Sequence, residues 1–191
     1  MAIEAAKLNG LRENKIFSSL KKIKDVNGRL ELIRTFSNKV KVYVDFAHTP
    51  DALEKALKSL QSYYGRDITL VFGCGGDRDF KKRPIMAKIA SINCKKIYVT
   101  DDNPRNEDPK KIRDEIIKNI KFTNYFNIGN RTQAIKKAVT NAEHGEIILV
   151  AGKGHEKEQI YKNKIISISD SQIIKKLKIK TKKLSNINLT F

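Results

Sequence analysis

Residues 40–76, VKVYVDFAHTPDALEKALKSLQSYYGRDITLVFGCGG, change their hydrophobic period twice, and this decides the fold class. VKVYVDF (40–46) and DITLVFG (67–73) are short runs rich in β-branched and aromatic residues, as buried strands are. Between them, PDALEKALKSLQSYY (50–64) has apolar residues at helical spacing and follows a Thr49-Pro50 capping pair. Strand, helix and strand predict two parallel strands joined by a right-handed crossover.

The same alternation continues along the chain. Further strands are expected at 95–101, 124–129 and 146–152, and helices in KRPIMAKIASI, DPKKIRDEIIKNI and RTQAIKKAVTNA. The sequence therefore predicts an α/β fold: a Rossmann-like, mainly parallel sheet with helices on both faces.

Both ends of the chain predict smaller elements. Residues 2–23 indicate two short helices broken at Asn9-Gly10. After the fifth strand, KEQIYKNKIISIS predicts an antiparallel hairpin that turns at Lys162-Asn163, and Asp170-Ser171 is expected to cap a last helix. Residues 179–191 form a basic tail to which no role is assigned.

Composition excludes several classes of protein. The 191 residues suit one domain with part of a second, and no apolar run approaches the length of a membrane span, so a cytoplasmic location without a membrane partner is expected. Cys74 and Cys94 match no metal-ligand or disulfide spacing. The formal charge of +18 comes from lysines scattered through every segment, which argues against a specific nucleic-acid partner.

Loops that leave the carboxyl ends of parallel strands lie along one edge of the sheet, where ligands bind. In this chain those loops are DFAHTPD, GCGGDRDFKKR, TDDNPRNEDP, GNRTQ and AGKGHEKEQ. They concentrate glycine, histidine and charged residues at one edge. That edge is the candidate site.

The stretch GCGGDRD (73–79) leaves two interpretations open. It lacks the third glycine of a dinucleotide fingerprint and the Lys-Ser or Lys-Thr of a P-loop. Gly73, Gly75 and Gly76 either form a tight turn that needs positive φ or allow the backbone to approach a ligand closely.

The stretch DDNPRNEDP is equally open from spacing alone. Pro104 should hold Asn103 extended and present Asp102 and Arg105 from a stiff loop. An amino-acid ligand needs an acidic acceptor and an arginine fork at a fixed separation. A capped turn with a surface ion pair explains the same residues.

The histidines at this edge carry weaker signals. His48 precedes the Thr49 cap, where a helix N-terminus favours anions, although a plain capping role explains the position equally well. His155 and Glu156 lack a metal-ligand spacing, so no protein-built metal site is expected.

Four motifs, in one order, resemble the carboxy-terminal domain of the Mur ligase family, in the branch that adds meso-diaminopimelate. They are DFAHTPDALEKAL, FGCGGDRDFKKRPIMAKIA, VTDDNPRNEDP and LVAGKGHEKEQIY. The resemblance runs from about residue 27 to 171. It implies a Mur ligase C-terminal domain at 27–178, with residues 1–26 as the closing helices of a preceding central ATPase domain.

The resemblance also implies an activity. Family members join an amino acid to UDP-MurNAc-L-Ala-D-Glu for peptidoglycan, using ATP and Mg²⁺ to form an acyl phosphate that the amine attacks. It implies that Arg29, Asp45 and His48 contact ATP. By the same resemblance GCGGDRD is a scaffold turn leading to Arg83, and the residues expected to hold meso-diaminopimelate are Arg83, Asp102, Asn103, Pro104, Arg105, Gly152 and Glu156.

One departure from the family pattern limits this expectation. The chain contains no Gly-Lys-Ser or Gly-Lys-Thr, so the P-loop and the magnesium ligands are expected in the N-terminal and central ligase domains, and this chain alone is not expected to catalyse. Two alternatives remain at this stage: the lysine-adding branch of the family, and a basic Rossmann-like module that binds nucleic acid or a nucleotide.

Overall fold

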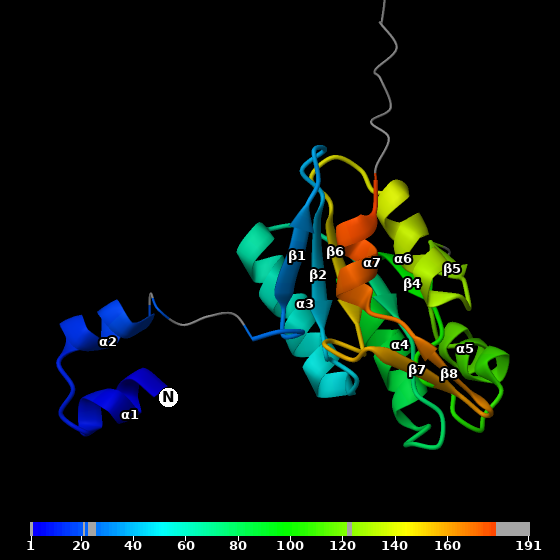
Figure 1. The fold of residues 1–191 in the computed structure, drawn as a ribbon, viewed down its shortest axis with the longest axis horizontal. Helices are drawn as coiled ribbons and strands as arrows, with labels where there is room; N and C mark the ends of the chain where they lie inside the picture. Colours follow the sequence, from blue (N-terminus) through cyan, green and yellow to red (C-terminus); the bar gives the residue numbers. More distant parts are fainter. Residues whose placement is uncertain (1, 21, 23–25, 122–123, 179–191) are drawn as a thin grey trace, which may run out of the picture.

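The computed structural model describes residues 2–20, 22, 26–121 and 124–178. A six-stranded sheet forms its centre, in the order β1-β2-β6-β3-β4-β5 (Figure 1). Along the order β2-β6-β3-β4-β5, every strand pairs in parallel with its neighbour, as predicted. The edge strand β1 pairs antiparallel with β2. The strands are β1 (Glu31–Thr35), β2 (Lys41–Asp45), β3 (Ile68–Phe72), β4 (Cys94–Val99), β5 (Tyr125–Asn127) and β6 (Ile147–Ala151).

Helices cover both faces of this sheet because its central strands are apolar on both sides. In β3, Leu70 packs with the residues of α3, α4 and α5, whereas Val71 packs with those of α6 and α7. Every residue of β3 and β6 is buried, as parallel strands between two helical layers should be. The helices are α3 (Pro50–Tyr64), α4 (Lys82–Asn93), α5 (Pro109–Ile117), α6 (Arg131–Thr140) and α7 (Asp170–Lys176).

Local caps begin these helices where the sequence predicts. Thr49 accepts a hydrogen bond from the Ala52 N–H, and Asp108 accepts one from the Lys110 N–H. The last helix differs from the prediction, because α7 begins at Asp170 and its cap is Ser169, which accepts from the Gln172 N–H. The side chain of Asp170 is thereby free for a partner inside the protein.

That partner is Arg131, at the first position of α6. Both side chains are fully buried; Arg131 Nε donates to Asp170 Oδ1 at 2.8 Å, and Nη2 donates to Oδ2 at 2.7 Å. Arg131 also donates to the carbonyl oxygens of Asp101, at 3.4 Å, and Ala151, at 3.0 Å. The pair therefore fastens the α6–α7 layer to the loops that leave β4 and β6.

The hairpin after β6 forms as predicted. It consists of β7 (Glu158–Tyr161) and β8 (Lys164–Ser167), which pair antiparallel around Lys162-Asn163. At the other end, α1 (Ala2–Leu8) and α2 (Glu13–Leu20) confirm the two predicted helices and are joined by a Lys7–Glu13 ion pair. The basic tail at 179–191 lies outside the described residues. No helix in the described ranges has both the length and the apolar character needed to cross a membrane.

The glycines of GCGGDRD have a different role from the positive-φ turn considered above. None of Gly73, Gly75 and Gly76 has a positive φ; in this turn the positive value belongs to Asp77. A Cβ on Gly73 would overlap the carbonyl oxygen of Thr100, and one on Gly76 would overlap that of Pro104. Gly73 and Gly76 are needed because the loop after β3 lies directly on the backbone of the loop after β4.

This packing predicts a difference between adjacent glycines. Gly76→Ala is expected to lower the free energy of unfolding by about 1–3 kcal/mol, because the new methyl group meets backbone that cannot move freely. Gly75→Ala is the matched control, since its Cβ would crowd only the flexible end of the Arg105 side chain, at 2.8 Å, while the nearest backbone atom, the Asn103 carbonyl oxygen, lies at an ordinary contact distance of 3.5 Å. Urea denaturation measures both variants, and an equal loss in the two would contradict the packing argument.

The buried ion pair leads to a second prediction. Arg131→Ala leaves the carboxylate of Asp170 buried without its partner, so it is expected to lower the free energy of unfolding by about 3–5 kcal/mol. Lys110→Ala breaks the exposed Lys110–Asp114 pair, which is expected to contribute only about 0–1 kcal/mol. Chemical denaturation at neutral pH compares them, and similar losses would show that Arg131 is not the anchor of this layer.

Candidate functional site

Asp102 lies at the centre of the carboxyl edge of the sheet. Its side chain is buried between two glycines: a Cβ on Gly152 would lie 2.7 Å from Oδ2, and one on Gly75 would lie 3.9 Å from Oδ1. Oδ1 accepts a hydrogen bond from the Asn103 N–H at 2.7 Å. Oδ2 is buried and has no hydrogen-bond partner within the described protein. A buried carboxylate oxygen without a partner is costly, so this atom is suited to accept from a ligand.

Asn103, Lys153 and Glu156 form a connected cluster beside Asp102. The Asn103 side-chain N–H donates to Glu156 Oε2 at 3.0 Å, and Lys153 Nζ donates to the same oxygen at 2.8 Å. Lys153 Nζ also donates to Asn103 Oδ1 at 3.1 Å. The cluster joins the loop after β4 to the loop after β6, two segments about fifty residues apart in the chain.

The environment of Glu156 keeps it ionised. Burial acts to raise its pKa, but hydrogen bonds from Lys153 and Asn103 and the positive charges of Lys153 and Arg105 outweigh burial, so the pKa is lowered. The carboxylate is therefore charged at neutral pH. Its Oε2 is held by two donors, which leaves Oε1 for other contacts.

Arg105 stands at the rim of this cluster in an unusual backbone conformation. Its φ is +52°, in the left-handed region that non-glycine residues rarely adopt. The hairpin holds it there, because the Arg105 N–H donates to the Ile160 carbonyl oxygen at 2.9 Å. Its side-chain Nη1 donates to the carbonyl oxygens of Gly76, at 2.9 Å, and Asn103, at 3.3 Å. These contacts are to neutral groups, so within the described residues its charge is not matched by an acidic partner.

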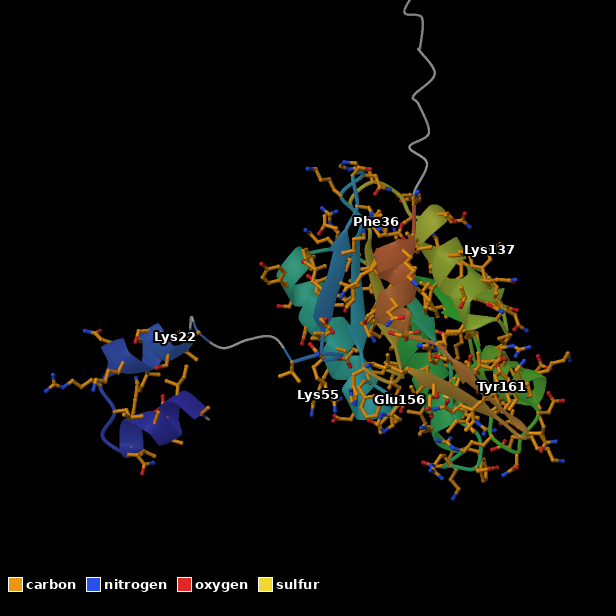
Figure 2. All side chains as sticks on the ribbon, in the orientation of Figure 1. Lys22, Phe36, Lys55, Lys137, Glu156 and Tyr161 are labelled. Carbon is orange, nitrogen blue, oxygen red and sulfur yellow. The ribbon has the colours of Figure 1, made fainter. Side chains whose placement is uncertain are left out.

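The hairpin strand β7 clamps the loop after β4. Gln159, which is buried, donates from Nε2 to the carbonyl oxygens of Asp101 and Asp102, at 3.0 and 2.6 Å. The Ile160 N–H donates to Asn103 Oδ1 at 3.0 Å, and the Tyr161 hydroxyl donates to Asp101 Oδ2 at 2.9 Å. Glu156 and Tyr161 are both labelled at this edge in Figure 2. Three consecutive residues of one strand thus fix three consecutive residues of the loop.

Arg83 and Pro104 have a supporting position. Arg83 is almost completely buried; Nη2 donates to Glu107 at 2.8 Å and Nη1 donates to Glu115 at 2.7 Å, while Nε has no partner in the described protein. Two acids thus already hold the Arg83 guanidinium. Pro104 is buried and forms the surface on which Gly76 rests.

The three residues expected to contact ATP lie near Phe46: two have exposed side chains, and the third, Asp45, is buried. The guanidinium of Arg29 sits over the Phe46 ring, 4.7 Å from its centroid, and His48 and His155 pack on the same ring. Arg29, His48 and His155 are exposed and offer three nitrogen-bearing groups to solvent. Asp45 is buried and accepts from the Leu30 and Ala47 N–H groups, both at 2.7 Å, so it shapes the two loops that carry the exposed residues.

Residues 152–156 connect these two clusters. Gly152 lies against Asp102, and Lys153 and Glu156 reach Asn103. Gly154 lies against Phe46 and Gly28, with a Cβ position only 2.7 Å from the Phe46 Cβ, so no larger residue fits there. One short loop therefore contributes to both groups of predicted site residues.

Sequence reasoning missed Lys153, Gln159 and Tyr161. A lysine between two glycines and polar residues on a short strand carry no local sign of a shared contact. Their proximity to Asn103, Asp102 and Asp101 follows only from the sheet order and the hairpin. Within the described residues, no group of three histidine, cysteine, aspartate or glutamate side chains is arranged to hold a metal ion.

Part of this chain matches a known protein family, and curated proteins resemble it in sequence. Residues 28–154 match the family model described as Mur ligase, glutamate ligase domain. A relative from Rickettsia bellii, UDP-N-acetylmuramoyl-L-alanyl-D-glutamate--2,6-diaminopimelate ligase, is 46% identical over 162 residues, which is 84% of this chain and 33% of that protein. The chain spans about a third of the length of the curated relatives it matches.

Solved structures of ligases also resemble this chain. One titled as the structure of a UDP-N-acetylmuramoyl-L-alanyl-D-glutamate--2,6-diaminopimelate ligase superposes with a TM-score of 0.72 and 35% identity, over 91% of this chain and 36% of that one. A UDP-N-acetylmuramate-alanine ligase from Thermotoga maritima, at 18% identity over 80% of this chain and 32% of its own, shares the fold with a TM-score of 0.61. The family match, the sheet order and the likeness to solved ligases together show that this chain belongs to the Mur ligase family, as its C-terminal, Rossmann-like domain.

Proposed function

We propose that this chain is the amino-acid-binding part of an ATP-dependent amide ligase that joins meso-diaminopimelate to UDP-MurNAc-L-Ala-D-Glu in peptidoglycan precursor synthesis. The Rickettsia bellii relative, a diaminopimelate ligase 46% identical over 84% of this chain, supports that reaction. Because the chain spans about a third of those relatives, it acts as one part of a larger ligase.

The single observation that carries the proposal is the unpartnered Oδ2 of Asp102. A buried carboxylate needs a donor, and a ligand ammonium group supplies up to three N–H donors together with a positive charge. Glu156 offers a second ionised carboxylate next to it, through the intervening Asn103. These acceptors suit the amine end of an amino acid.

The opposite charge is supplied by Arg105. Its Nη1 is held by carbonyl oxygens, which leaves Nε and Nη2 to face a ligand carboxylate. Arg105 Nη1 and Asp102 Oδ1 both lie within 4 Å of the Cβ position of Gly75, so the cation and the acceptor are close enough to contact one small molecule. Such a pair fits a group with both an ammonium and a carboxylate, which each end of meso-diaminopimelate has and the side-chain end of lysine lacks.

The second cluster is proposed to face the nucleotide. Arg29 and His48, exposed around Phe46, provide groups that can attract phosphate, and Asp45 holds their loops in place. When bound, ATP with Mg²⁺ supplies the phosphoryl group that activates the substrate carboxylate. The contribution of this chain is to orient the incoming amine and to balance charge nearby.

The remaining segments are proposed to link this domain to the rest of the ligase. We assign residues 1–26 to the end of a central ATPase domain, with 27–178 as the C-terminal domain. Apolar side chains of α1, α2 and the segment between them are exposed, as expected for helices that pack against a further domain. These side chains are Leu8, Leu11, Phe17 and Leu20.

The substrate assignment predicts the effect of removing Arg105. In an enzyme that joins this chain to the N-terminal and central ligase domains, Arg105→Ala is expected to lower kcat/KM for meso-diaminopimelate about 10- to 150-fold relative to L-lysine. The reason is that the two amino acids differ at one end by a carboxylate, which only a cation can match. Phosphate release with each amino acid measures the ratio.

Arg78→Ala is the matched control for this experiment. Arg78 lies on the GCGGDRD turn, is exposed, and donates only to the neighbouring Asp77 carbonyl oxygen in the described protein. The ratio should stay the same in this variant. A folded Arg105→Ala enzyme with an unchanged ratio would contradict the assigned role of Arg105, and an unsubstituted enzyme that prefers lysine would contradict the substrate.

A further inference from the structure

Lys153 is a charged side chain enclosed in the protein beside the candidate site. Its side chain is 1% exposed, and its Nζ donates to Asn103 Oδ1 and Glu156 Oε2, at 3.1 and 2.8 Å. A lysine is rarely buried without a specific partner, because its ammonium group loses strong hydration. Lys153 has two partners, and both are proposed ligand-binding residues.

The contacts of Lys153 decide how the Asn103 amide is oriented. Asn103 Oδ1 accepts from Lys153 Nζ and from the Ile160 N–H, so the oxygen must face these two donors. The Asn103 NH₂ group then points to Glu156 Oε2, which also accepts from Lys153. Without the Lys153 ammonium group, Asn103 Oδ1 would accept only from the Ile160 N–H. Glu156 Oε2 would accept only from the Asn103 side chain.

Lys153 also decides the net charge of the candidate site. Asp102 and Glu156 contribute two negative charges, and Arg105 and Lys153 contribute two positive charges. The buried arginines nearby are matched elsewhere: Arg83 by Glu107 and Glu115, and Arg131 by Asp170. The four groups therefore sum to zero, which suits a ligand end with both an ammonium and a carboxylate.

We propose that Lys153 is a positioning and specificity-determining residue that fixes Asn103 and Glu156 and keeps the candidate site neutral, so that it favours a zwitterionic amino-acid end over a lone ammonium group. The inference rests on the proposed function and extends it. Replacing Lys153 by an uncharged residue leaves the site with one excess negative charge. Such a site attracts the side-chain ammonium of lysine relatively better than the neutral end of meso-diaminopimelate.

The charge of Lys153 has a separate physical signature at Glu156. Lys153, Asn103 and Arg105 lower the Glu156 pKa against the effect of burial. Arg131 is coupled by charge to both Asp102 and Glu156. Lys153 supplies both a hydrogen bond and a charge that lower the Glu156 pKa. Its removal should therefore raise that pKa, whether or not an amino acid is bound.

The experiment uses this 191-residue chain and the Lys153→Met variant, which keeps an unbranched side chain one atom shorter and removes the charge. Carbon-detected NMR titration of the chain gives the Glu156 pKa, and kcat/KM for meso-diaminopimelate and L-lysine is measured in the enzyme that joins each variant to the N-terminal and central ligase domains. We expect a higher Glu156 pKa and a preference for meso-diaminopimelate over lysine that falls about 10-fold. A purely structural role would weaken both amino acids equally and leave their ratio unchanged.

Two further variants complete the test. Lys157→Met makes the same substitution at an exposed lysine four residues away. It should change neither the Glu156 pKa nor the ratio between the two amino acids. Lys153→Gln keeps a hydrogen-bond donor without the charge, and it tests the charge argument if Lys153→Met does not fold. An unchanged Glu156 pKa and ratio in a folded variant overturns the inference. If the joined, unsubstituted enzyme uses neither amino acid, the proposed function fails, whereas the Glu156 titration still decides the role of Lys153.

Discussion

The site depends on one steric constraint: the backbone after β3 lies directly on the backbone after β4. Gly73 and Gly76 permit this contact because any side chain there would overlap the carbonyl oxygens of Thr100 and Pro104. The close approach brings Gly75 beside Asp102 and Arg105, and it leaves Gly76 as an acceptor for the Arg105 side chain. The positions of Asp102 and Arg105 therefore depend on backbone contacts made by the uncharged glycines.

Charge is distributed unevenly around this contact. Arg83 and Arg131, both almost fully buried, are matched by acidic side chains within the protein and hold loops and helices together. Arg105 contacts only neutral carbonyl oxygens in the described structure, and Asp102 has an oxygen without a partner. Arg131 is structural, because all three of its guanidinium nitrogens have partners, whereas Arg83 keeps a buried Nε without a partner in the described protein. Arg105 and Asp102, which have no oppositely charged partner there, are suited to a ligand.

Much of the fold could be predicted from local patterns, because strands, helices and caps are set by neighbouring residues. The parallel strands, the hairpin turn and the Thr49 and Asp108 caps are confirmed. Strand β1 was missed because ELIRT is short, lies at the sheet edge and exposes Leu32, so it lacks the apolar run of a buried strand. The α7 cap is Ser169, one residue before the predicted Asp170-Ser171, and the pattern cannot separate these positions because all three residues are capping types.

The candidate site was predictable only in part. The loop rule for parallel sheets gave the correct edge, and the family resemblance selected residues that do meet there, among them Asp102, Asn103 and Glu156. The positive-φ role of Gly73, Gly75 and Gly76 was wrong because the obstacle lies on another loop. No spacing rule links Arg83 to Glu115 or Lys153 to Asn103, since these contacts arise between distant segments.

The loop at 152–156 contacts both Asn103 and Phe46, so its five residues form a common base for the two proposed ligand sites. The distance between the group proposed to face the amine and the group proposed to face the nucleotide is therefore set within this domain. Rotating the domain as a whole would change where both groups point without changing the distance between them.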